Sequence, residues 1–552
     1  MRNCYLTLAL FVISVLTSWS QALQSAQLIH SLTPTQIDSF LTANGVPSGI
    51  VPIRNGLDVY RITYNTISYD SSATIATGTL FLPQGSGTCK KPIFNYCHGT
   101  IIKKADAPSY KVGEYVIGIC FGANGMITTM PDYLGLGPVS PGLHPYIHAH
   151  SEATASIHMI RSSKYFMDSL NYNYSDQLFL SGYSQGGHAS MATHKMMEEH
   201  HSAEFPNIVM SAPLSGPYDV SGVQAEVITK DSSYGSPGYL PFVIFSYNMV
   251  YNMYSNWDAV LDTPYNTVVP PLMDGSVGLG TVENFIPDTP NLILLPALLD
   301  SFENFPNHPF RQVLALNNLW DWVPNAPVRM GYCESDELVS YKNAIACRDS
   351  MIARGATDVQ AFSANSTLSH SNCALFALLA VNGLFTPLRE DLITLNLTVT
   401  HESAAGAGDG AVVSNVTGWA SAFNYLWSNN ATTSNLTNVD PGQYTLTVTD
   451  SNGCSASSQV AVGTIGIENI ADLPNFVLYP NPAKDQFTIR MANFTSDADL
   501  AIVDLMGKVV INKVIPAGTE IINIGSSMLS KGVYLVKIGY GNLLVTKRVI
   551  IE

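Results

Sequence analysis

The sequence reads QLFLSGYSQGGH at residues 177–188, and this stretch carries the strongest indication of a fold. The apolar run over 178–180 predicts a buried strand, and the residues after Gly187 are compatible with a helix. Between them lies Gly-x-Ser-x-Gly, the sharp turn that exposes a nucleophilic serine at the end of a strand. Gly182 and Gly186 lack the side chains that would collide there. We therefore predict that Ser184 is a nucleophile, and an idle serine in a glycine-rich turn is the alternative.

Strands and helices alternate from about residue 57 to residue 390. Short buried strands separated by helices predict a doubly wound, mostly parallel sheet. Such sheets carry their reactive groups at the carboxyl ends of the strands. The expected strands span residues 59–67, 74–82, 92–97, 126–130, 177–180, 208–212, 328–331 and 359–362, and the expected helices span 151–170, 187–201, 340–353 and 373–381.

The interval between residues 219 and 327 breaks this alternation. It is rich in Tyr, Phe, Trp, Met and Pro, and residues 239–254 and 292–302 have the character of apolar helices. Long ordered excursions of this kind are usually lids or binding elements. We expect an inserted, mainly helical cap at about residues 222–325. A structural subdomain with no role toward substrate is the alternative.

A serine nucleophile needs a base, a carboxylate that orients the base, and donors for the oxyanion. In this type of fold the chain order is serine, acid, histidine. An acidic turn follows the strand at 328–331, and Asp336 is the predicted acid, with Glu334 and Glu337 as alternatives. His370 follows the last strand and is the only histidine between Asp336 and residue 400, so it is the predicted base. A surface histidine is the alternative interpretation of His370.

The oxyanion hole needs two backbone N–H groups, and one is expected from Gln185, directly after the nucleophile. The second is expected from the loop that follows the strand at 92–97. Thr100 is the predicted donor there, and Gly99 comes next. His98 and Asp132 are interpreted as residues that shape loops, not as acid–base groups.

Four histidines, His144, His148, His150 and His158, raise the question of a metal site. No acidic ligand completes a catalytic spacing such as His-Glu-x-x-His. We therefore expect these histidines to line the entrance of the cleft or to bond loop backbone. Neither a metal nor a cofactor is expected.

The charge balance is 26 basic against 42 acidic residues, a net charge of −16, which argues against nucleic-acid partners and anionic membranes. Arg2 precedes an apolar run over residues 6–16, and small residues follow it, so residues 1–21 are predicted to be a signal peptide. That run is too short to span a bilayer, and no transmembrane segment is expected in the mature chain. Of the seven cysteines left after cleavage, six lie before residue 390 and Cys454 stands apart, with the pairing left open.

After about residue 390 the helical pattern disappears. Residues 394–463 are rich in Thr, Asn and Gly and alternate in stretches such as 444–448, while residues 475–552 hold further alternating strands, among them 487–491 and 533–538. Both segments are predicted to be small all-β modules. Residues 473–475 are the expected linker.

Several motifs occur together in the first part of the chain: Asn95-Tyr-Cys-His-Gly-Thr100, Pro131-Asp-Tyr-Leu-Gly-Leu-Gly137, His144-Pro-Tyr146 and Gly182-Tyr-Ser-Gln-Gly-Gly-His188. The combination resembles secreted α/β-hydrolase lipases and esterases related to fungal lipase A, over about residues 30–385. This resemblance implies an α/β-hydrolase fold with a cap and hydrolysis of carboxylic esters through an acyl-enzyme. It carries the triad over as Ser184, Asp336 and His370.

The tail has resemblances of its own. Tyr425–Thr433 and Val448–Cys454 are similar to the SprB-type repeat of gliding-bacterium surface proteins. Leu478–Pro482, Asp504–Lys508 and Gly532–Val536 are similar to a type IX secretion sorting domain. The second resemblance implies a Bacteroidetes-like bacterium, the type IX machinery as partner, and removal of the terminal domain. A carbohydrate-binding β-sandwich is the alternative for these modules.

The resulting expectation is a secreted or cell-surface serine hydrolase that cleaves carboxylic esters. Its parts are a signal peptide at 1–21, an α/β-hydrolase domain at 22–388, an SprB-like module at 394–464 and a sorting domain at 475–552. One alternative is a serine peptidase, either an aminopeptidase or a prolyl-oligopeptidase type, although only about 35 mature residues precede the first expected strand, too few for a propeller. The other is a non-catalytic surface adhesin on a hydrolase scaffold. Acyl length, the distinction between lipase and esterase, and oligomeric state stay open.

Overall fold

The computed structural model describes residues 23–464 and 476–552, apart from residues 86, 421, 492–496, 506 and 541–542. The predicted signal peptide and the predicted linker at 473–475 lie outside the described residues. Two compact units divide the described chain. The first comprises residues 23–397, 414–434 and 445–459, and the second comprises 398–413, 435–444 and 460–552.

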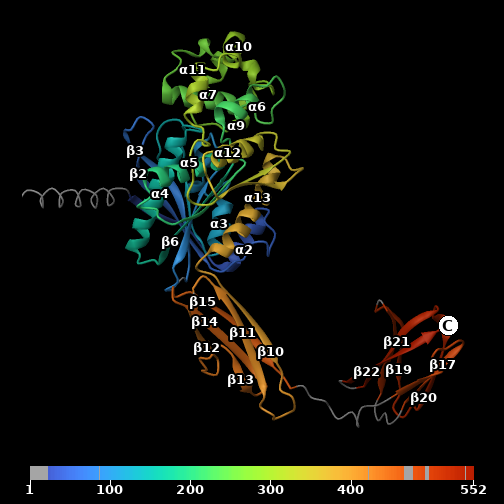
Figure 1. The fold of residues 1–552 in the computed structure, drawn as a ribbon. Helices are drawn as coiled ribbons and strands as arrows, with labels where there is room; N and C mark the ends of the chain where they lie inside the picture. Colours follow the sequence, from blue (N-terminus) through green and yellow to red (C-terminus); the bar gives the residue numbers. More distant parts are fainter. Residues whose placement is uncertain are drawn as a thin grey trace, which may run out of the picture. The chain divides into compact units, whose positions relative to one another are not determined.

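A nine-stranded sheet forms the centre of the first unit (Figure 1). The first four strands in the sheet order pair antiparallel and the strands from β5 to β9 pair parallel, so the sheet is mixed. In sheet order the strands are β1 (Leu23–Leu32), β2 (Leu57–Ile67), β3 (Ala73–Pro83), β5 (Ile127–Pro131), β4 (Lys91–Cys97), β6 (Tyr174–Tyr183), β7 (Ile208–Leu214), β8 (Val328–Cys333) and β9 (Val359–Asn365).

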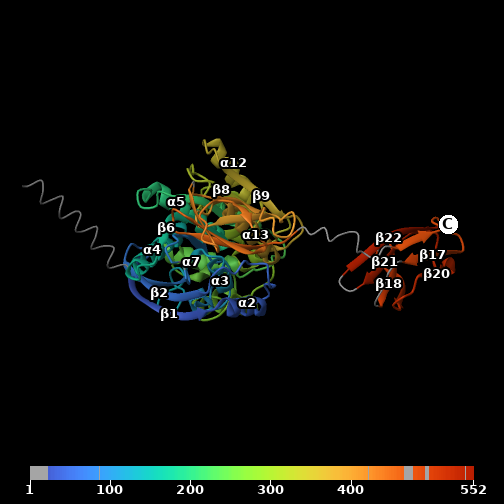
Figure 2. The same cartoon turned by 90° about the horizontal axis from the view of Figure 1, so that it is seen from below.

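All eight expected strands are confirmed, with longer bounds at several ends, but β1 was not predicted. β1 and β9 form opposite edges of the sheet (Figure 2). Most side chains of β1 are exposed or half-buried. Because an edge strand is held by backbone pairing to one neighbour, it needs no buried apolar run, and its sequence carries little strand signal.

Helices cover both faces of the sheet (Figure 1). Phe179 of β6 belongs to the apolar cluster under α2, α3 and α13, whereas Leu178 and Leu180 belong to the cluster under α4 and α5. This alternation follows from the two-residue period of a strand. The helices on the first face are α2 (Pro34–Ala43), α3 (Tyr115–Ala123) and α13 (His370–Phe385), and those on the second are α4 (Ala149–Ser169), α5 (Gln185–His200) and α12 (Lys342–Ala353).

The four expected helices of the alternating region are confirmed, whereas α2 and α3 were not predicted. α2 has a sequence signal that could have revealed it, because Thr33 and Gln36 form a capping box with Pro34 at the first helical position. α3 is apolar almost throughout, so it lacks the 3.6-residue period by which a helix is recognised.

Short helices fill the interval between β7 and β8 and gather at one end of the first unit (Figure 1). They enclose an apolar cluster of their own, to which Phe242, Leu261 and Ile293 contribute. The described residues of this interval are therefore mainly helical. Its elements are η3 (Val220–Gln224), α6 (Ala225–Thr229), α7 (Tyr239–Tyr251), η4 (Trp257–Ala259), α8 (Tyr265–Val268), η5 (Pro270–Leu272), α9 (Leu279–Glu283), η6 (Pro290–Ile293), α10 (Pro296–Asn304) and α11 (Pro309–Ala315).

One helical stretch of the described residues, His370–Leu388, is long and apolar enough to cross a membrane by length and composition alone. Cys373, Ala377 and Val381 recur at a spacing of four residues and are fully buried in the cluster that α13 shares with the sheet. The stretch therefore also fits a helix that packs one face on the core of a folded domain.

The segment from Ile393 to Val462 contributes strands to two small three-stranded sheets. One contains β10 (Ile393–Thr400), β11 (Gly410–Gly418) and β13 (Leu436–Val439), and the other contains β12 (Phe423–Trp427), β14 (Gly442–Asp450) and β15 (Ser455–Val462). Antiparallel pairing joins β11 to β13 and β12 to β14.

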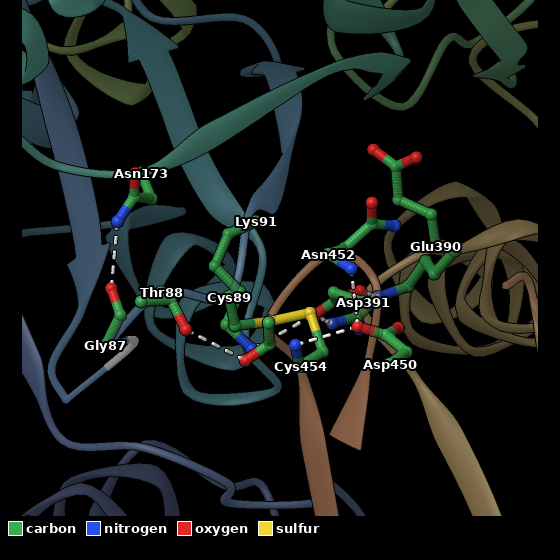
Figure 3. Close-up of a disulfide and its surroundings, with 12 residues drawn as sticks. Gly87, Thr88, Cys89, Lys91, Asn173, Glu390, Asp391, Asp450, Asn452 and Cys454 are labelled. Atoms are coloured by element: carbon green, nitrogen blue, oxygen red, sulfur yellow. Dashed lines mark hydrogen bonds and ion pairs between the residues drawn. A yellow bond between two sulfur atoms is a disulfide. The ribbon is translucent and has the colours of Figure 1, made fainter. Parts of the chain in front are cut away.

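A disulfide joins Cys89, just before β4, to Cys454, in the turn between β14 and β15 (Figure 3). Thr88 Oγ1 donates a hydrogen bond to the Gly453 carbonyl at 3.3 Å, and Asp450 Oδ1 accepts the Cys454 amide at 2.9 Å. Cys454, which stood apart in the sequence, thus has its partner 365 residues away. The turn after β14 is thereby linked covalently to the nine-stranded sheet domain.

The end of the chain forms two antiparallel sheets in the second unit. Phe487, Leu500 and Val536 are fully buried between them, and the expected strands at 487–491 and 533–538 are confirmed. The strands are β16 (Phe476–Tyr479), β17 (Gln486–Met491) and β20 (Ile521–Gly525) in one sheet, and β19 (Val509–Ile515), β18 (Ala498–Asp504), β21 (Gly532–Tyr540) and β22 (Leu543–Ile551) in the other.

Candidate active site

Ser184 lies in the sharp turn between β6 and α5. Its backbone has φ 60° and ψ −120°, a left-handed conformation that is strained for any residue with a side chain. A Cβ at Gly182 would lie 2.2 Å from the Gly186 carbonyl oxygen, and one at Gly186 would lie 1.9 Å from the Cys97 carbonyl oxygen. Both glycines are therefore required by the close approach of backbone on each side of Ser184.

Asp336 and His370 lie side by side at the ends of β8 and β9. Asp336 Oδ2 is 2.7 Å from His370 Nδ1, and the Asp336 carboxylate is fully buried. Its other oxygen, Oδ1, accepts the backbone amides of Leu338 at 3.0 Å and Val339 at 2.8 Å. These bonds hold the carboxylate in one orientation against the imidazole.

The two alternative acids do not contact the imidazole in this way. Glu337 Oε2 accepts the backbone amide of His370 at 2.9 Å, at the start of α13, and Glu334 is exposed. The disulfide between Cys333 and Cys373 links the end of β8 to α13 beside this pair. Of the three carboxylates in the turn, Asp336 is the one that bonds the ring of His370.

Tyr183 connects His370 to the turn that carries Ser184. The two rings are 5.0 Å apart between centroids, and Tyr183 Oη donates a hydrogen bond to the His370 carbonyl at 2.5 Å. Since Asp336 occupies Nδ1, the free ring nitrogen of His370 is Nε2. Among the described residues no hydrogen bond joins Ser184 Oγ to that nitrogen, and such bonds often tighten only in a substrate complex.

The loop after β4 lies directly against the turn, because a Cβ at Gly99 would be 3.4 Å from the Tyr183 carbonyl oxygen. The Gly99 amide is already bonded to Glu114 Oε1 at 2.9 Å, so Gly99 is not a free oxyanion donor. The amides of Thr100 and Gln185 make no hydrogen bond within the described part of the chain. Gln185 opens α5, where the first N–H groups of a helix have no partner in the helix itself.

His98 and Asp132 hold neighbouring loops in place. His98 is fully buried, with Nδ1 2.7 Å from the Gly99 carbonyl and Nε2 3.3 Å from the Asp132 carbonyl. Asp132 Oδ2 accepts the Thr77 hydroxyl at 2.6 Å, Oδ1 accepts the Ser109 amide at 3.1 Å, and burial raises the pKa of this carboxyl. These contacts fit the expected loop-shaping roles.

Three of the four histidines considered as metal ligands bond protein groups, and His150 is exposed. His144 Nδ1 is 2.8 Å from the Leu134 carbonyl, His148 Nδ1 is 3.0 Å from Ser151 Oγ, and His158 Nδ1 is 2.8 Å from Thr66 Oγ1. Burial lowers the pKa of each of these three histidines to about 4. The described residues contain no group of three or more His, Cys, Asp or Glu side chains placed to hold a metal ion.

A buried network beneath the turn, centred on Glu152 of α4, was not predicted from the sequence. Glu152 is fully buried and bonds the side chains of Gln185 and His188. A sequence signal did exist, since Glu152 is the only charged residue between His150 and Arg161 in a stretch otherwise suited to burial. Charged residues are rarely fully buried unless they are paired.

A small cavity of about 40 Å³ adjoins Ser184 and Gln185. Two further apolar cavities, of about 40 and 20 Å³, follow it into the helical segment. Val220 and Val243 line both the first and the second cavity, and Leu240 and Phe302 line both the second and the third. A separate apolar groove of about 290 Å³ lies between α3 and α13, and neither Ser184 nor Gln185 lines it.

Comparison with known proteins gives relatives for both ends of the chain. Residues 477–552 match the family model of the secretion system C-terminal sorting domain. The chain is similar to the rice cell wall degrading esterase LipA from Xanthomonas oryzae, with 29% identity over 66% of this chain and 96% of that chain and a TM-score of 0.58. It is also similar to a putative hydrolase from Legionella pneumophila, with 28% identity over 66% and 97% of the two chains and a TM-score of 0.61.

Candida antarctica lipase A is more distant, with 20% identity over 64% of this chain and 79% of that chain and a TM-score of 0.48, and nothing is concluded from it. No match was found among curated proteins.

The nine-stranded mixed sheet and the similar solved structures point to an α/β-hydrolase-like core, and the esterases among those structures support a hydrolase that acts on esters. The small antiparallel sheets that follow are separate from this core in the sheet order. The match at residues 477–552 supports secretion or location at the cell surface.

Proposed function

We propose that this protein is a secreted serine esterase or lipase that works through an acyl-enzyme, with Ser184, Asp336 and His370 as its triad. The observation that carries the proposal is the 2.7 Å contact between Asp336 and His370, on a histidine that packs against the residue preceding Ser184. An aspartate on Nδ1 leaves Nε2 of the imidazole free to take a proton from a serine.

In the proposed reaction, Ser184 Oγ attacks the ester carbonyl carbon while His370 Nε2 takes the hydroxyl proton. Collapse of the tetrahedral intermediate breaks the ester C–O bond, and His370 gives the proton to the leaving alcohol. Water then attacks the acyl-enzyme with His370 again as the base, which releases the carboxylic acid and restores Ser184.

The oxyanion of both tetrahedral intermediates is proposed to lie between the amides of Gln185 and Thr100. Support comes from the free state of these two amides and from the Gly99 amide being bonded to Glu114. Two donors aimed at the developing charge are the usual requirement for acyl transfer.

The helical segment between β7 and β8 is proposed to act as the cap expected at about residues 222–325. Its residues Val220 and Val243 wall the cavity at Ser184, and the cavities beyond are lined by apolar side chains. An apolar acyl group attached to Ser184 would be stabilised by contact with these side chains, because each buried CH₂ contributes about 0.8 kcal/mol to binding.

The remaining domain assignments are proposed with the bounds expected from the sequence: a signal peptide at 1–21, the hydrolase domain at 22–388, an SprB-like module at 394–464 and a sorting domain at 475–552. The disulfide links Cys89, within residues 22–388, covalently to Cys454, within residues 394–464. Removal of the sorting domain by the type IX machinery would leave that link in place.

Hydrolysis of p-nitrophenyl esters by the wild type and by Ser184→Ala tests the proposal. The wild type is expected to hydrolyse these esters and to react with a fluorophosphonate probe, and Ser184→Ala is expected to lose both, with kcat lower by about 10⁴-fold or more. Peptide p-nitroanilides cleaved faster than the esters would indicate a peptidase. A folded wild type that neither hydrolyses esters nor reacts with the probe would indicate the non-catalytic adhesin.

A further inference from the structure

The side chain of Glu152 holds the start of α5 at two points. Its Oε1 accepts the Gln185 side-chain amide at 2.8 Å, and its Oε2 accepts His188 Nδ1–H at 2.7 Å. Both partners lie in the first turn of α5, which begins directly after Ser184. All three side chains are almost fully buried, so water does not compete for these bonds.

Both ring nitrogens of His188 face oxygen atoms in this arrangement. Its Nε2 is 2.9 Å from the backbone carbonyl of Asn317, and a carbonyl can only accept. Its Nδ1 faces the carboxylate of Glu152. Burial by itself would raise the pKa of Glu152, but the charge of His188 and the hydrogen bonds from His188 and Gln185 lower it below its usual value. The Glu152 carboxylate and the His188 ring therefore form a buried, directly bonded pair.

His144 accepts the second amide hydrogen of the Gln185 side chain, whose oxygen Oε1 is buried without a partner among the described residues. Gln185 Nε2 is 2.6 Å from His144 Nε2, and the amide nitrogen is the donor, so His144 accepts at that atom. Its Nδ1–H then donates to the Leu134 carbonyl at 2.8 Å. Burial lowers the pKa of His144 to about 4, which agrees with a neutral ring. Both amide hydrogens of Gln185 are thus used, and its side chain has a single orientation.

We propose that Glu152 is a positioning residue for the oxyanion hole. It acts through the side chain of Gln185, whose backbone amide is the proposed oxyanion donor, and through His188, which holds the same first turn of the helix. The peptide bond that joins Ser184 to Gln185 follows a residue with a strained backbone, φ 60°. Because the Gln185 side chain is bonded to Glu152, the backbone amide of Gln185 is restricted in its rotation. This inference rests on the proposed esterase function.

Glu152→Gln keeps the size of the side chain and removes its charge. With its oxygen toward Gln185, the new amide places its NH₂ group against His188 Nδ1, which must then accept; in the reverse orientation Gln185 loses its acceptor. In both orientations the stronger bonds to a charged carboxylate are lost. We expect kcat for p-nitrophenyl esters to fall about 10- to 100-fold while KM stays within about threefold, because the amide acts mainly in the transition state. Rates are divided by the number of sites that react to completion with a fluorophosphonate, so that unfolded molecules are not counted.

Glu198→Gln is the matched control. Glu198 forms another glutamate–histidine pair on α5, with Oε1 2.9 Å from His194 Nε2, and it lies toward the far end of the helix from Ser184. This variant is expected to keep kcat within about twofold, because within the described chain Glu198 bonds His194, Asn325 and Ala326 and none of the groups at the start of α5. A loss equal to that of Glu152→Gln would show a general effect of α5 stability and would overturn the inference.

A double-mutant cycle with Gln185→Met identifies the route. Gln185→Met keeps the backbone amide and the chain length but removes the anchored group. If Glu152 acts through Gln185, the double variant loses little more than the more impaired single variant. Independent losses that multiply, or a wild-type kcat per titrated site in Glu152→Gln, would overturn the inference.

If Glu152→Gln does not fold, Gln185→Met alone tests the inference. A wild-type kcat in Gln185→Met would then overturn it. A wild type without esterase activity would instead refute the proposed function.

Discussion

Replacement of Asp336 by asparagine tests the proposed triad through the three hydrogen bonds that this side chain accepts. Oδ1 accepts the amides of Leu338 and Val339, and Oδ2 accepts Nδ1–H of His370. Asparagine has one oxygen acceptor and one NH₂ donor, so it can satisfy only one of these two sides.

The two orientations of the new amide differ in energy. With its oxygen toward the backbone amides, the NH₂ group faces His370 Nδ1, and the ring must carry its proton on Nε2, the atom that has to accept from Ser184. The reverse orientation keeps the active tautomer but leaves two buried N–H groups unbonded, at about 1–3 kcal/mol each. The inactive orientation is therefore favoured by about 2–6 kcal/mol, which lowers kcat by about 30- to 10⁴-fold, since about 1.4 kcal/mol corresponds to tenfold.

Steady-state hydrolysis of a p-nitrophenyl ester, with sites titrated by fluorophosphonate, measures this loss. Glu334→Gln serves as the control, because it changes an exposed carboxylate in the same turn and is expected to retain kcat within about twofold. Thermal unfolding of both variants separates inactivation from loss of fold. Asp336→Asn with a kcat within about threefold of the wild type would refute the proposed role of Asp336.

Three further predictions concern the cavity, the disulfide and the buried histidines. Val243→Phe narrows the cavity beside Ser184, so kcat/KM for long acyl esters is expected to fall at least about tenfold while acetate esters change little, and an equal loss across chain lengths would contradict it. Cleavage of the chain between residues 401 and 409 is expected to leave one species on a denaturing gel without reductant and two with it, whereas Cys89→Ser separates under both conditions. His158 has a pKa lowered to about 4 by burial against about 6.5 unfolded, so its contribution to the free energy of unfolding is lost as the pH falls below about 6.5. Urea unfolding at pH 7 and pH 5 is therefore expected to show a smaller loss of stability for His158→Gln than for the wild type, and equal losses would contradict this.

The part of the site that lies in continuous sequence could be predicted, because its chemistry is local. A buried strand, two glycines that backbone contacts require, and a helix start identify the turn at Ser184 without any knowledge of distant residues. The acid and the base follow their own strands, and the parallel order of those strands brings their ends to one edge of the sheet. Of three nearby carboxylates, Asp336 was the one selected, and the structure places it on His370.

Contacts between distant segments could not be predicted in this way. β1 is held by pairing at an edge, Cys89 finds Cys454 across 365 residues, and the Gly99 amide is taken by Glu114 from a later segment. The Glu152 network joins two helices and two loops, and the hydrophobic period of a helix or strand does not predict which buried polar groups will contact each other. The sequence by itself determined the local conformations and the residue types available for chemistry. Only the tertiary structure decided which donors are free and which carboxylates are bonded, because a hydrogen bond depends on where two separate backbones come to lie.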